Sequence, residues 1–174
     1  MIYMLKRIVS LCLLCCFSGI VMAQSQEQEA TLKAAFIFNF TRYIEWEKNP
    51  GENDFVIGVI GSSSLTGPLQ QIGRTKTVAN RKITIKNFDK PEDITYCNIL
   101  FIPKKIPYAL RSVLEKVGRG TLTISEESGY AKQGTAFNFI INNDKLKFEA
   151  NLKALYLAGL KASSQLLKLA IIVD

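Results

Sequence analysis

The chain has 174 residues, of which 22 are lysine or arginine and 15 are aspartate or glutamate, so its formal charge at neutral pH is +7. It contains no histidine, which excludes histidine triads, histidine general bases and histidine metal ligands and argues against an enzyme. The basic residues are spread along the chain without a basic block, so the charge is not evidence for nucleic-acid binding.

Residues 1–23 have the pattern of an export signal. Lys6 and Arg7 precede an uncharged apolar stretch, residues 8–22, which ends in the small-x-small pattern of a cleavage site at Ala23. The cysteines in this stretch follow Leu or Cys rather than the small residue of a lipid-anchor signal. We therefore expect cleavage after Ala23, no lipid anchor, a periplasmic location and one domain over residues 24–174, with a formal charge of +5.

Cysteine usage separates the signal from the rest of the chain. Three of the four cysteines lie in the expected signal, so the exported domain keeps only Cys97 and has no internal disulfide. Cys97 stands just before an apolar run, which favours a buried, unreactive thiol over a redox sensor.

Residues 30–47 are predicted to form a long helix. Apolar residues recur at three- and four-residue steps that include Leu32 and Phe40, whereas Ile37 falls on a different side. A helix that is apolar on more than one side packs on a sheet and also against something else, either a C-terminal helix or a second protomer. Its aromatic residues are therefore a candidate partner or dimer surface: Phe36, Phe38, Phe40, Tyr43 and Trp46.

The middle of the chain alternates between predicted strands and helices. Residues 55–60, FVIGVI, are an unbroken apolar run typical of a strand buried on both faces, and a Gly/Ser turn and a helix over 65–72 follow. Further strands are predicted at 82–88, 98–102 and 121–125, with helices at 91–94 and 106–117 between them. This order predicts an α/β fold with a mainly parallel, doubly wound sheet and helices on both faces.

The last forty residues show a different pattern. Residues 135–142 and 145–150 flank the short turn Asn143-Asp144, which predicts an antiparallel hairpin at one edge of the sheet. Asn151 is a suitable N-cap for a final long helix over residues 152–170.

The carboxyl edge of such a sheet is the usual place for a ligand. The residues predicted there form a candidate ligand edge: Ser62, Ser63, Ser64, Lys104 and Glu126. The glycine turn lacks the Lys-Ser/Thr ending of a P-loop and the three glycines of a dinucleotide fingerprint, so it also fits a tight turn in which Ser63 or Ser64 caps a helix. No catalytic constellation, metal site or cofactor site is predicted.

The order of several motifs resembles the YfiR family of exported proteins. The similar segments are LKAAF (32–36), NF (39–40), YIEW (43–46), IGVIG (57–61), CNILFI (97–102), LTIS (122–125) with GYA (129–131) and Gly134, FEAN (148–151), GL (159–160) and SSQLLKLA (163–170). They cover nearly all of the exported chain in the right order.

The resemblance implies a small periplasmic regulator rather than a catalyst. Family members bind and inhibit the periplasmic sensor part of an inner-membrane diguanylate cyclase. An outer-membrane partner can sequester them, which releases cyclic-di-GMP synthesis and biofilm formation. Similar domains also occur at the front of sensor kinases, and dimerisation is part of the family picture. Better-known members carry cysteine pairs, whereas this chain keeps only Cys97, so the resemblance does not extend to disulfide control.

Two functions of different classes follow from these observations. In the first, the chain is a repressor that binds the periplasmic part of an inner-membrane cyclase or sensor kinase through its aromatic first helix, forms a homodimer and meets an outer-membrane partner. In the second, it is a small-molecule-binding sensor module that uses the candidate ligand edge. An exposed aromatic patch would favour the first, and a pocket at the carboxyl edge would favour the second.

Overall fold

The computed structural model describes residues 26–46 and 54–174. The expected signal, residues 1–23, and the end of the predicted first helix at Glu47 lie outside the described residues. The elements in order are an N-terminal helix that is helical over 26–40, β1 (Ile44–Trp46), β2 (Phe55–Ile60), α2 (Thr66–Thr75), β3 (Thr77–Val78), β4 (Arg81–Phe88), η1 (Pro91–Asp93), β5 (Ile99–Ile102), α3 (Leu110–Leu114), β6 (Leu122–Ser125), β7 (Phe137–Asn142), β8 (Lys145–Asn151), α4 (Leu152–Leu157), β9 (Leu160–Ala162), α5 (Ser164–Leu167) and β10 (Ile171–Val173).

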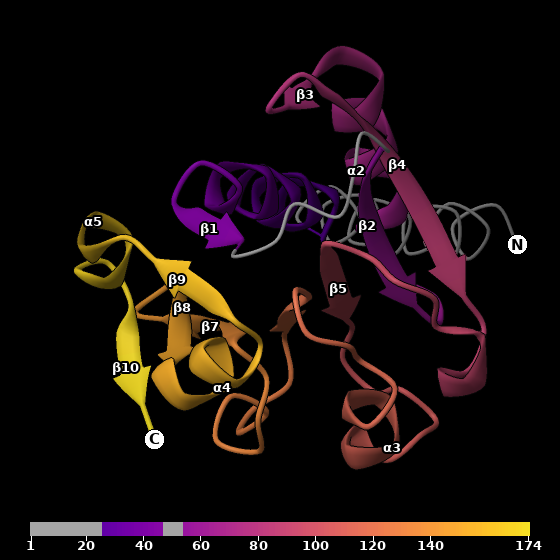
Figure 1. The fold of residues 1–174 in the computed structure, drawn as a ribbon. Coiled ribbons are helices and arrows are strands. Elements are labelled where there is room, and N and C mark those ends of the chain that lie inside the picture. The colour runs from indigo at the N-terminus through magenta and orange to yellow at the C-terminus, as the bar shows by residue number, and fades with distance from the viewer. Residues whose placement is uncertain (1–25, 47–53) are drawn as a thin grey trace, which may run out of the picture.

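One eight-stranded sheet organises the molecule, with strand order β10-β8-β7-β6-β5-β2-β4-β3 (Figure 1). Strands β4, β2, β5, β6 and β7 pair in parallel, and the remaining strands flank this parallel centre. The predicted α/β class and the mainly parallel sheet are confirmed, and the four predicted central strands agree with β2, β4, β5 and β6 to within one residue at each end.

Strand β5 shows that both faces of the sheet are covered. Ile99 and Phe101 belong to one apolar cluster, whereas the alternating Leu100 and Ile102 belong to another. The first cluster includes residues of the N-terminal helix, α2, α4 and α5, and the second includes residues of α3. Because side chains alternate along a strand, these two clusters lie on opposite faces.

The order of the sheet reverses between β2 and β5. From β2 the chain passes through α2, on the face of the first cluster, to β4 on one side; from β5 it passes through α3, on the other face, to β6 on the opposite side. Such a switch point leaves a crevice outside the carboxyl ends of the two strands, because the two connections diverge.

The β7–β8 hairpin is as the sequence predicts. Ile141 pairs with Leu146 and Asn142 with Lys145, and both turn residues have positive φ, 51° at Asn143 and 56° at Asp144. The hairpin is not the edge, however, because β10 adds to β8 in parallel and is the outermost strand.

The predicted helix over residues 30–47 was too long at its C-terminal end. The helix ends at Phe40, and β1 pairs antiparallel with β9 in a separate two-stranded ribbon, with Ile44 opposite Ala162. The backbone nitrogen of Ser163 donates to the carbonyl of Tyr43 at 2.8 Å and extends this pairing. A long-range partner thus decides the conformation of residues that local spacing assigned to a helix.

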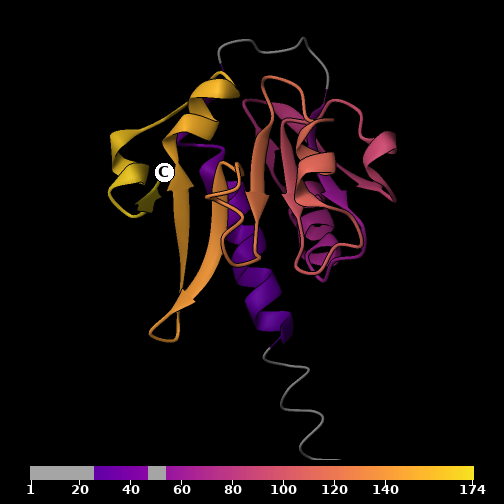
Figure 2. The same cartoon turned by 90° about the horizontal axis from the view of Figure 1, so that it is seen from below.

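The predicted helix over residues 152–170 was wrong. This segment contains the two short helices α4 and α5 with β9 between them, and β10 follows (Figure 2). Gly159, at φ +69°, ends α4, and the Ser163 hydroxyl accepts from the backbone nitrogen of Leu166 to begin α5. Apolar spacing of three and four residues fits two short helices as well as one long one.

The buried side of the N-terminal helix also differs from the prediction. Ile37 is fully buried, whereas Leu32 is 46% exposed. The buried positions lie one above another along a single stripe of the helix: Ala30, Lys33, Ala34, Ile37 and Phe40. Among the described residues, no helix is long and apolar enough to cross a membrane.

Candidate functional site at the carboxyl edge of the sheet

A cleft of about 550 Å³ opens at the carboxyl edge of the sheet. The loops after β2, β5 and β6 form its floor, and the N-terminal helix and the β7–β8 hairpin form its walls. Its polar lining comes from Gln26, Glu29, Lys33, Ser64, Lys104, Glu126 and Ser128. Its apolar lining comes from Ala30, Leu65, Phe139, Ile140, Ile141 and Leu146, so the cleft combines a charged side with an apolar side.

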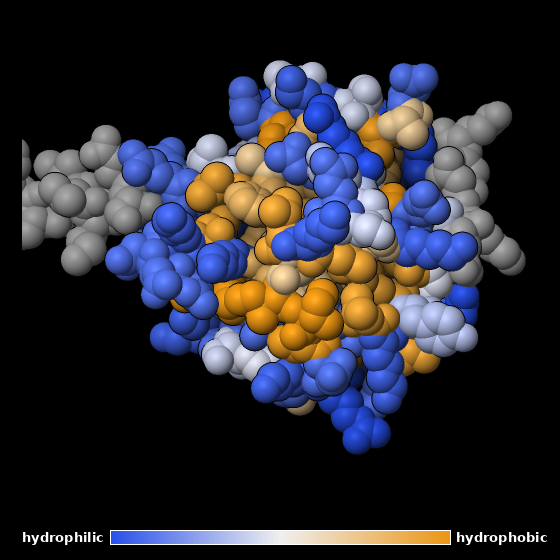
Figure 3. All heavy atoms as spheres, turned by 90° about the vertical axis from the view of Figure 1, so that its left-hand side faces the viewer, coloured by the Kyte–Doolittle hydropathy of each residue, from blue (hydrophilic) through white to orange (hydrophobic). Residues whose placement is uncertain are grey.

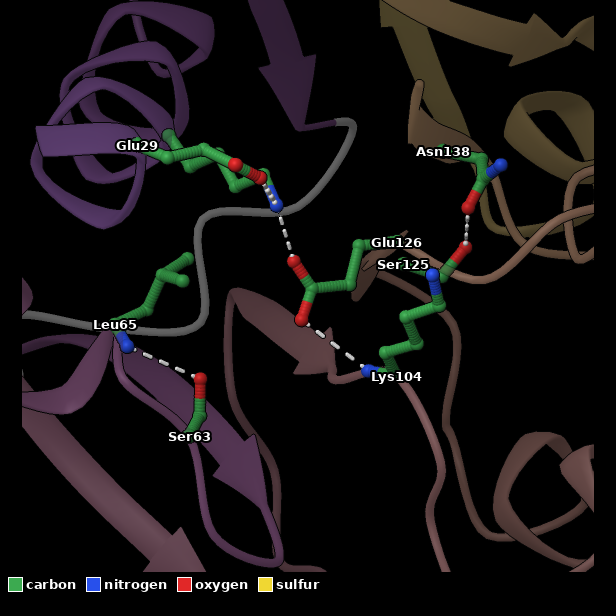
Figure 4. A network of polar contacts seen from close by, with 8 residues as sticks. Glu29, Ser63, Leu65, Lys104, Ser125, Glu126 and Asn138 are labelled. Carbon is green, nitrogen blue, oxygen red and sulfur yellow. Dashed lines mark hydrogen bonds and ion pairs between the residues drawn. The ribbon is translucent and has the colours of Figure 1, made fainter. Parts of the chain in front are cut away.

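Glu126, just after β6, connects three parts of the cleft (Figure 4). One carboxylate oxygen accepts from Lys33 Nζ at 2.6 Å, and the other accepts from the backbone nitrogen of Lys104 at 3.2 Å. Lys33 Nζ also lies 2.6 Å from Glu29 Oε1, one turn earlier in the same helix. The ion pair therefore connects the N-terminal helix to the carboxyl ends of β5 and β6.

Lys33 is charged although it is largely buried. Its side chain is 11% exposed and that of Glu126 is 14% exposed. Burial alone lowers the pKa of Lys33, but its hydrogen bonds to Glu126 and Glu29 and their negative charges outweigh burial and raise the pKa above its ordinary value of 10.5. The ammonium group stays protonated at every physiological pH.

The structure brings together part of the candidate ligand edge. Ser64, Lys104 and Glu126 line the cleft, whereas Ser62 and Ser63 are not part of its lining. The Ser63 hydroxyl instead accepts from the backbone nitrogen of Leu65 at 3.1 Å and stabilises the turn before α2, as Figure 4 shows. That turn role is the alternative that the sequence left open.

Sequence reasoning missed Lys33, Glu29, Ser128 and the apolar wall. Lys33 could have been found from the sequence, because it lies three residues after Ala30 and four before Ile37, on the buried stripe of the helix. A lysine at a core position is costly unless it is paired, so its position called for a partner carboxylate elsewhere in the chain.

A buried polar network fixes β6 to the hairpin next to the cleft. The Ser125 hydroxyl donates to Asn138 Oδ1 at 2.8 Å, and Asn138 Nδ2 donates to Glu149 Oε2 at 2.9 Å. Figure 4 shows the contact between Ser125 and Asn138, and both residues are fully buried. The network orients the strand end that carries Glu126.

The candidate partner surface on the first helix divides into two groups. Phe40 is 2% exposed and contacts Phe137 and Phe148 in the core, whereas Phe36, Phe38, Tyr43 and Trp46 are half-buried. The Arg42 guanidinium lies 5.6 Å from the centre of the Phe38 ring. The C-terminal segment packs into the same apolar cluster, through Leu155, Leu160 and Leu166.

Cys97 lies two residues before β5 and is not among the residues that line the cleft. It is a free, buried thiol, as predicted, and burial raises its pKa to about 12 despite a hydrogen bond with the Gly58 backbone. The described part of the chain holds no group of three or more acidic, Cys or His side chains that could bind a metal ion.

The doubly wound sheet, the cleft at its switch point and the ribbon between the two ends of the fold define a small α/β domain. The model of the YfiR/HmsC-like family matches residues 30–171, and the chain belongs to this family. The resemblance seen in the sequence motifs is confirmed.

Proposed function

We propose that the chain is a periplasmic regulator that binds and represses the sensor part of an inner-membrane signalling enzyme and so controls cyclic-di-GMP and biofilm formation. Membership of the YfiR/HmsC-like family, which is regulatory rather than catalytic, supports the proposal. The export signal expected over residues 1–23 agrees with a periplasmic location. A homodimer, and an outer-membrane protein that sequesters the regulator, are parts of the same proposal.

The main structural support is an apolar surface on the side of the molecule that carries the C-terminal segment (Figure 3). Tyr156 is 79% exposed, Leu157 60% and Leu169 71%. The large apolar side chains exposed on this segment are Leu152, Tyr156, Leu157, Leu169, Ile171 and Ile172. Contiguous apolar patches of this kind on a soluble domain mark protein interaction sites.

Tyr43 and Trp46, the half-buried aromatic residues that follow the N-terminal helix, lie beside the C-terminal segment. Tyr43 bonds to Ser163 just before α5, and β1 with Trp46 pairs with β9. The partner surface that we propose therefore combines Phe36, Phe38, Tyr43 and Trp46 with the exposed residues of the C-terminal segment.

Deletion and complementation in the encoding bacterium test the proposal. Deletion of the gene is expected to raise cellular cyclic-di-GMP, and the wild-type gene is expected to restore it. Tyr156→Glu and Leu169→Glu are expected to fail to restore it, because a charge in the contact disfavours binding. The control Thr77→Glu adds the same charge to an exposed residue of β3, at the opposite edge of the sheet, and should complement fully.

Two results would contradict this proposal. Unchanged cyclic-di-GMP after deletion would remove the regulatory role. If cyclic-di-GMP rises after deletion and both surface variants restore it, the regulatory role stands but the proposed partner surface is wrong.

A further inference from the structure

We propose that the cleft at the carboxyl edge binds a small organic anion, with its carboxylate at Lys104 and its apolar body on Ile141 and Leu146. This site is separate from the partner surface, since none of the residues of that surface lines the cleft. Its test does not depend on the regulatory function.

The position of the cleft is the first argument. The reversal of strand order between β2 and β5 creates a crevice outside their carboxyl ends, whatever side chains line it. The cleft lies there, with Ser64 from the loop after β2 and Lys104 from the loop after β5 in its lining. Its volume of about 550 Å³ falls within the range of small-molecule sites, about 300–1,000 Å³.

The charges of the lining favour an anion over a cation. The carboxylates of Glu29 and Glu126 already bind Lys33, and Glu126 also accepts from the backbone nitrogen of Lys104. An incoming ammonium group would have to share these carboxylates with Lys33. The Lys104 ammonium group, in contrast, has no ion-pair partner among the described residues, so an incoming carboxylate can pair with it without breaking a bond.

The remaining lining suits the rest of such a ligand. The exposed hydroxyls of Ser64 and Ser128 can donate to an anionic head group. Ile141 and Leu146 are direct partners across the β7–β8 hairpin, and Ile141 is 57% exposed. An alkyl chain or ring placed on this pair would bury apolar surface that water now covers.

Calorimetric titration of the purified protein with octanoate, octylammonium and octanol tests the proposal. Octanoate should bind at least about ten times more tightly than octylammonium, with octanol between them. Lys104→Gln should weaken octanoate binding about tenfold, and Lys105→Gln, its exposed neighbour outside the lining, should leave it unchanged. Ser64→Asp, which adds a negative charge to the lining, should also weaken binding, whereas Ser62→Asp should not.

The proposal is overturned if octylammonium binds as tightly as octanoate, or if none of the three probes binds. It is also overturned if Lys104→Gln and Ser64→Asp behave like their controls. Amide NMR shifts caused by octanoate should cluster at Ser64, Ser128 and Leu146; shifts confined to α4 and β10 would place the ligand elsewhere. Circular dichroism of each variant separates lost binding from lost folding.

Discussion

Lys33 and Glu126 stand 93 positions apart in the chain, and their side chains meet with 2.6 Å between Nζ and Oε2. Both side chains are largely buried, whereas Glu29, the second carboxylate that pairs with Lys33, is 44% exposed. The contact holds the N-terminal helix against the carboxyl edge of the sheet, so the wall and the floor of the cleft are one unit.

Removal of one partner of this pair should be costly. Lys33→Met is expected to lower the free energy of unfolding by about 2–4 kcal/mol, because it leaves the largely buried Glu126 carboxylate without a cation. The double variant Lys33→Met, Glu126→Leu should recover much of this loss. Urea denaturation followed by circular dichroism measures both. The exposed pair Arg111–Glu115 is the control, and Arg111→Ala should cause no measurable change.

Two glycines should respond differently to the same substitution. A Cβ on Gly58 in β2 would lie 2.6 Å from the Phe88 ring and 3.1 Å from Cys97 Sγ, so Gly58→Ala should destabilise the fold by about 1–3 kcal/mol. Apart from its chain neighbours, a Cβ on Gly67 in α2 meets nothing within 4 Å. Gly67→Ala should change the stability by less than about 1 kcal/mol, because the helix preference of alanine is opposed by the contact between its Cβ and the ring of the next residue, Pro68. Thermal melts would contradict this account if Gly67→Ala lowered the melting temperature as much as Gly58→Ala.

The buried Cys97 thiol predicts insensitivity to reductant. Cys97 has no disulfide partner in the described chain, so melts with and without dithiothreitol should superimpose. Cys97→Ser should cost about 1–3 kcal/mol, because burial of a hydroxyl costs more than burial of a thiol and the hydrogen bond with the Gly58 backbone offsets only part of that cost. A large drop in melting temperature with dithiothreitol would instead indicate a disulfide between chains.

The same thiol gives a pH dependence with a defined sign. The pKa of Cys97 is about 12 in the fold against an ordinary value of 9.0, so the folded state holds its proton more tightly. Its contribution to stability is fully present below pH 9 and is lost as the pH rises to about 12. Under reducing conditions, stability should fall less steeply over this interval in Cys97→Ala than in the wild type. Equal slopes would show that the thiol is not buried in solution.

The proposed dimer is tested at Phe38. Phe38 is half-buried on the N-terminal helix beside Arg42, so a charge there should disturb a contact between chains more than the core. Phe38→Glu should shift the protein from dimer to monomer in light scattering while its circular dichroism stays native. Phe40→Glu is the contrast, because Phe40 is a core residue and its replacement should unfold the chain. Loss of native circular dichroism in Phe38→Glu would make this face internal core.

The central strands β2 and β5 were predictable because each is a short apolar run with a clear break after it, and burial on both faces leaves that pattern in the sequence. The C-terminal segment was not predictable in the same way. The spacing of its leucines fits either one long helix or two short ones. The structure has two, because Gly159 adopts a positive φ that ends α4 and Ser163 caps α5, and neither feature can be read from the spacing. Strand β1 depends on a partner near the far end of the chain, which local spacing cannot show.

Part of the lining of the cleft could be predicted from the order of the strands alone. Ser64, Lys104 and Glu126 follow successive parallel strands, so the rule for carboxyl ends places them together. The wall formed by the N-terminal helix could not be predicted, because the side of this helix that faces the sheet was assigned incorrectly. Lys33 lies on the same buried stripe of the helix as Ala30 and Ile37, so the correct assignment of this stripe also places Lys33 on the side that faces the sheet.

The β1–β9 ribbon also bears on the order in which the chain can fold. Ile44 finds its partner only at Ala162, so the N-terminal helix cannot be fixed from both ends until nearly the whole chain is available. Contacts between such distant positions form late, because closing the intervening loop costs entropy before any contact is gained. A chain that is exported unfolded would therefore keep its first helix unlocked throughout translocation and complete its fold only on the far side of the membrane.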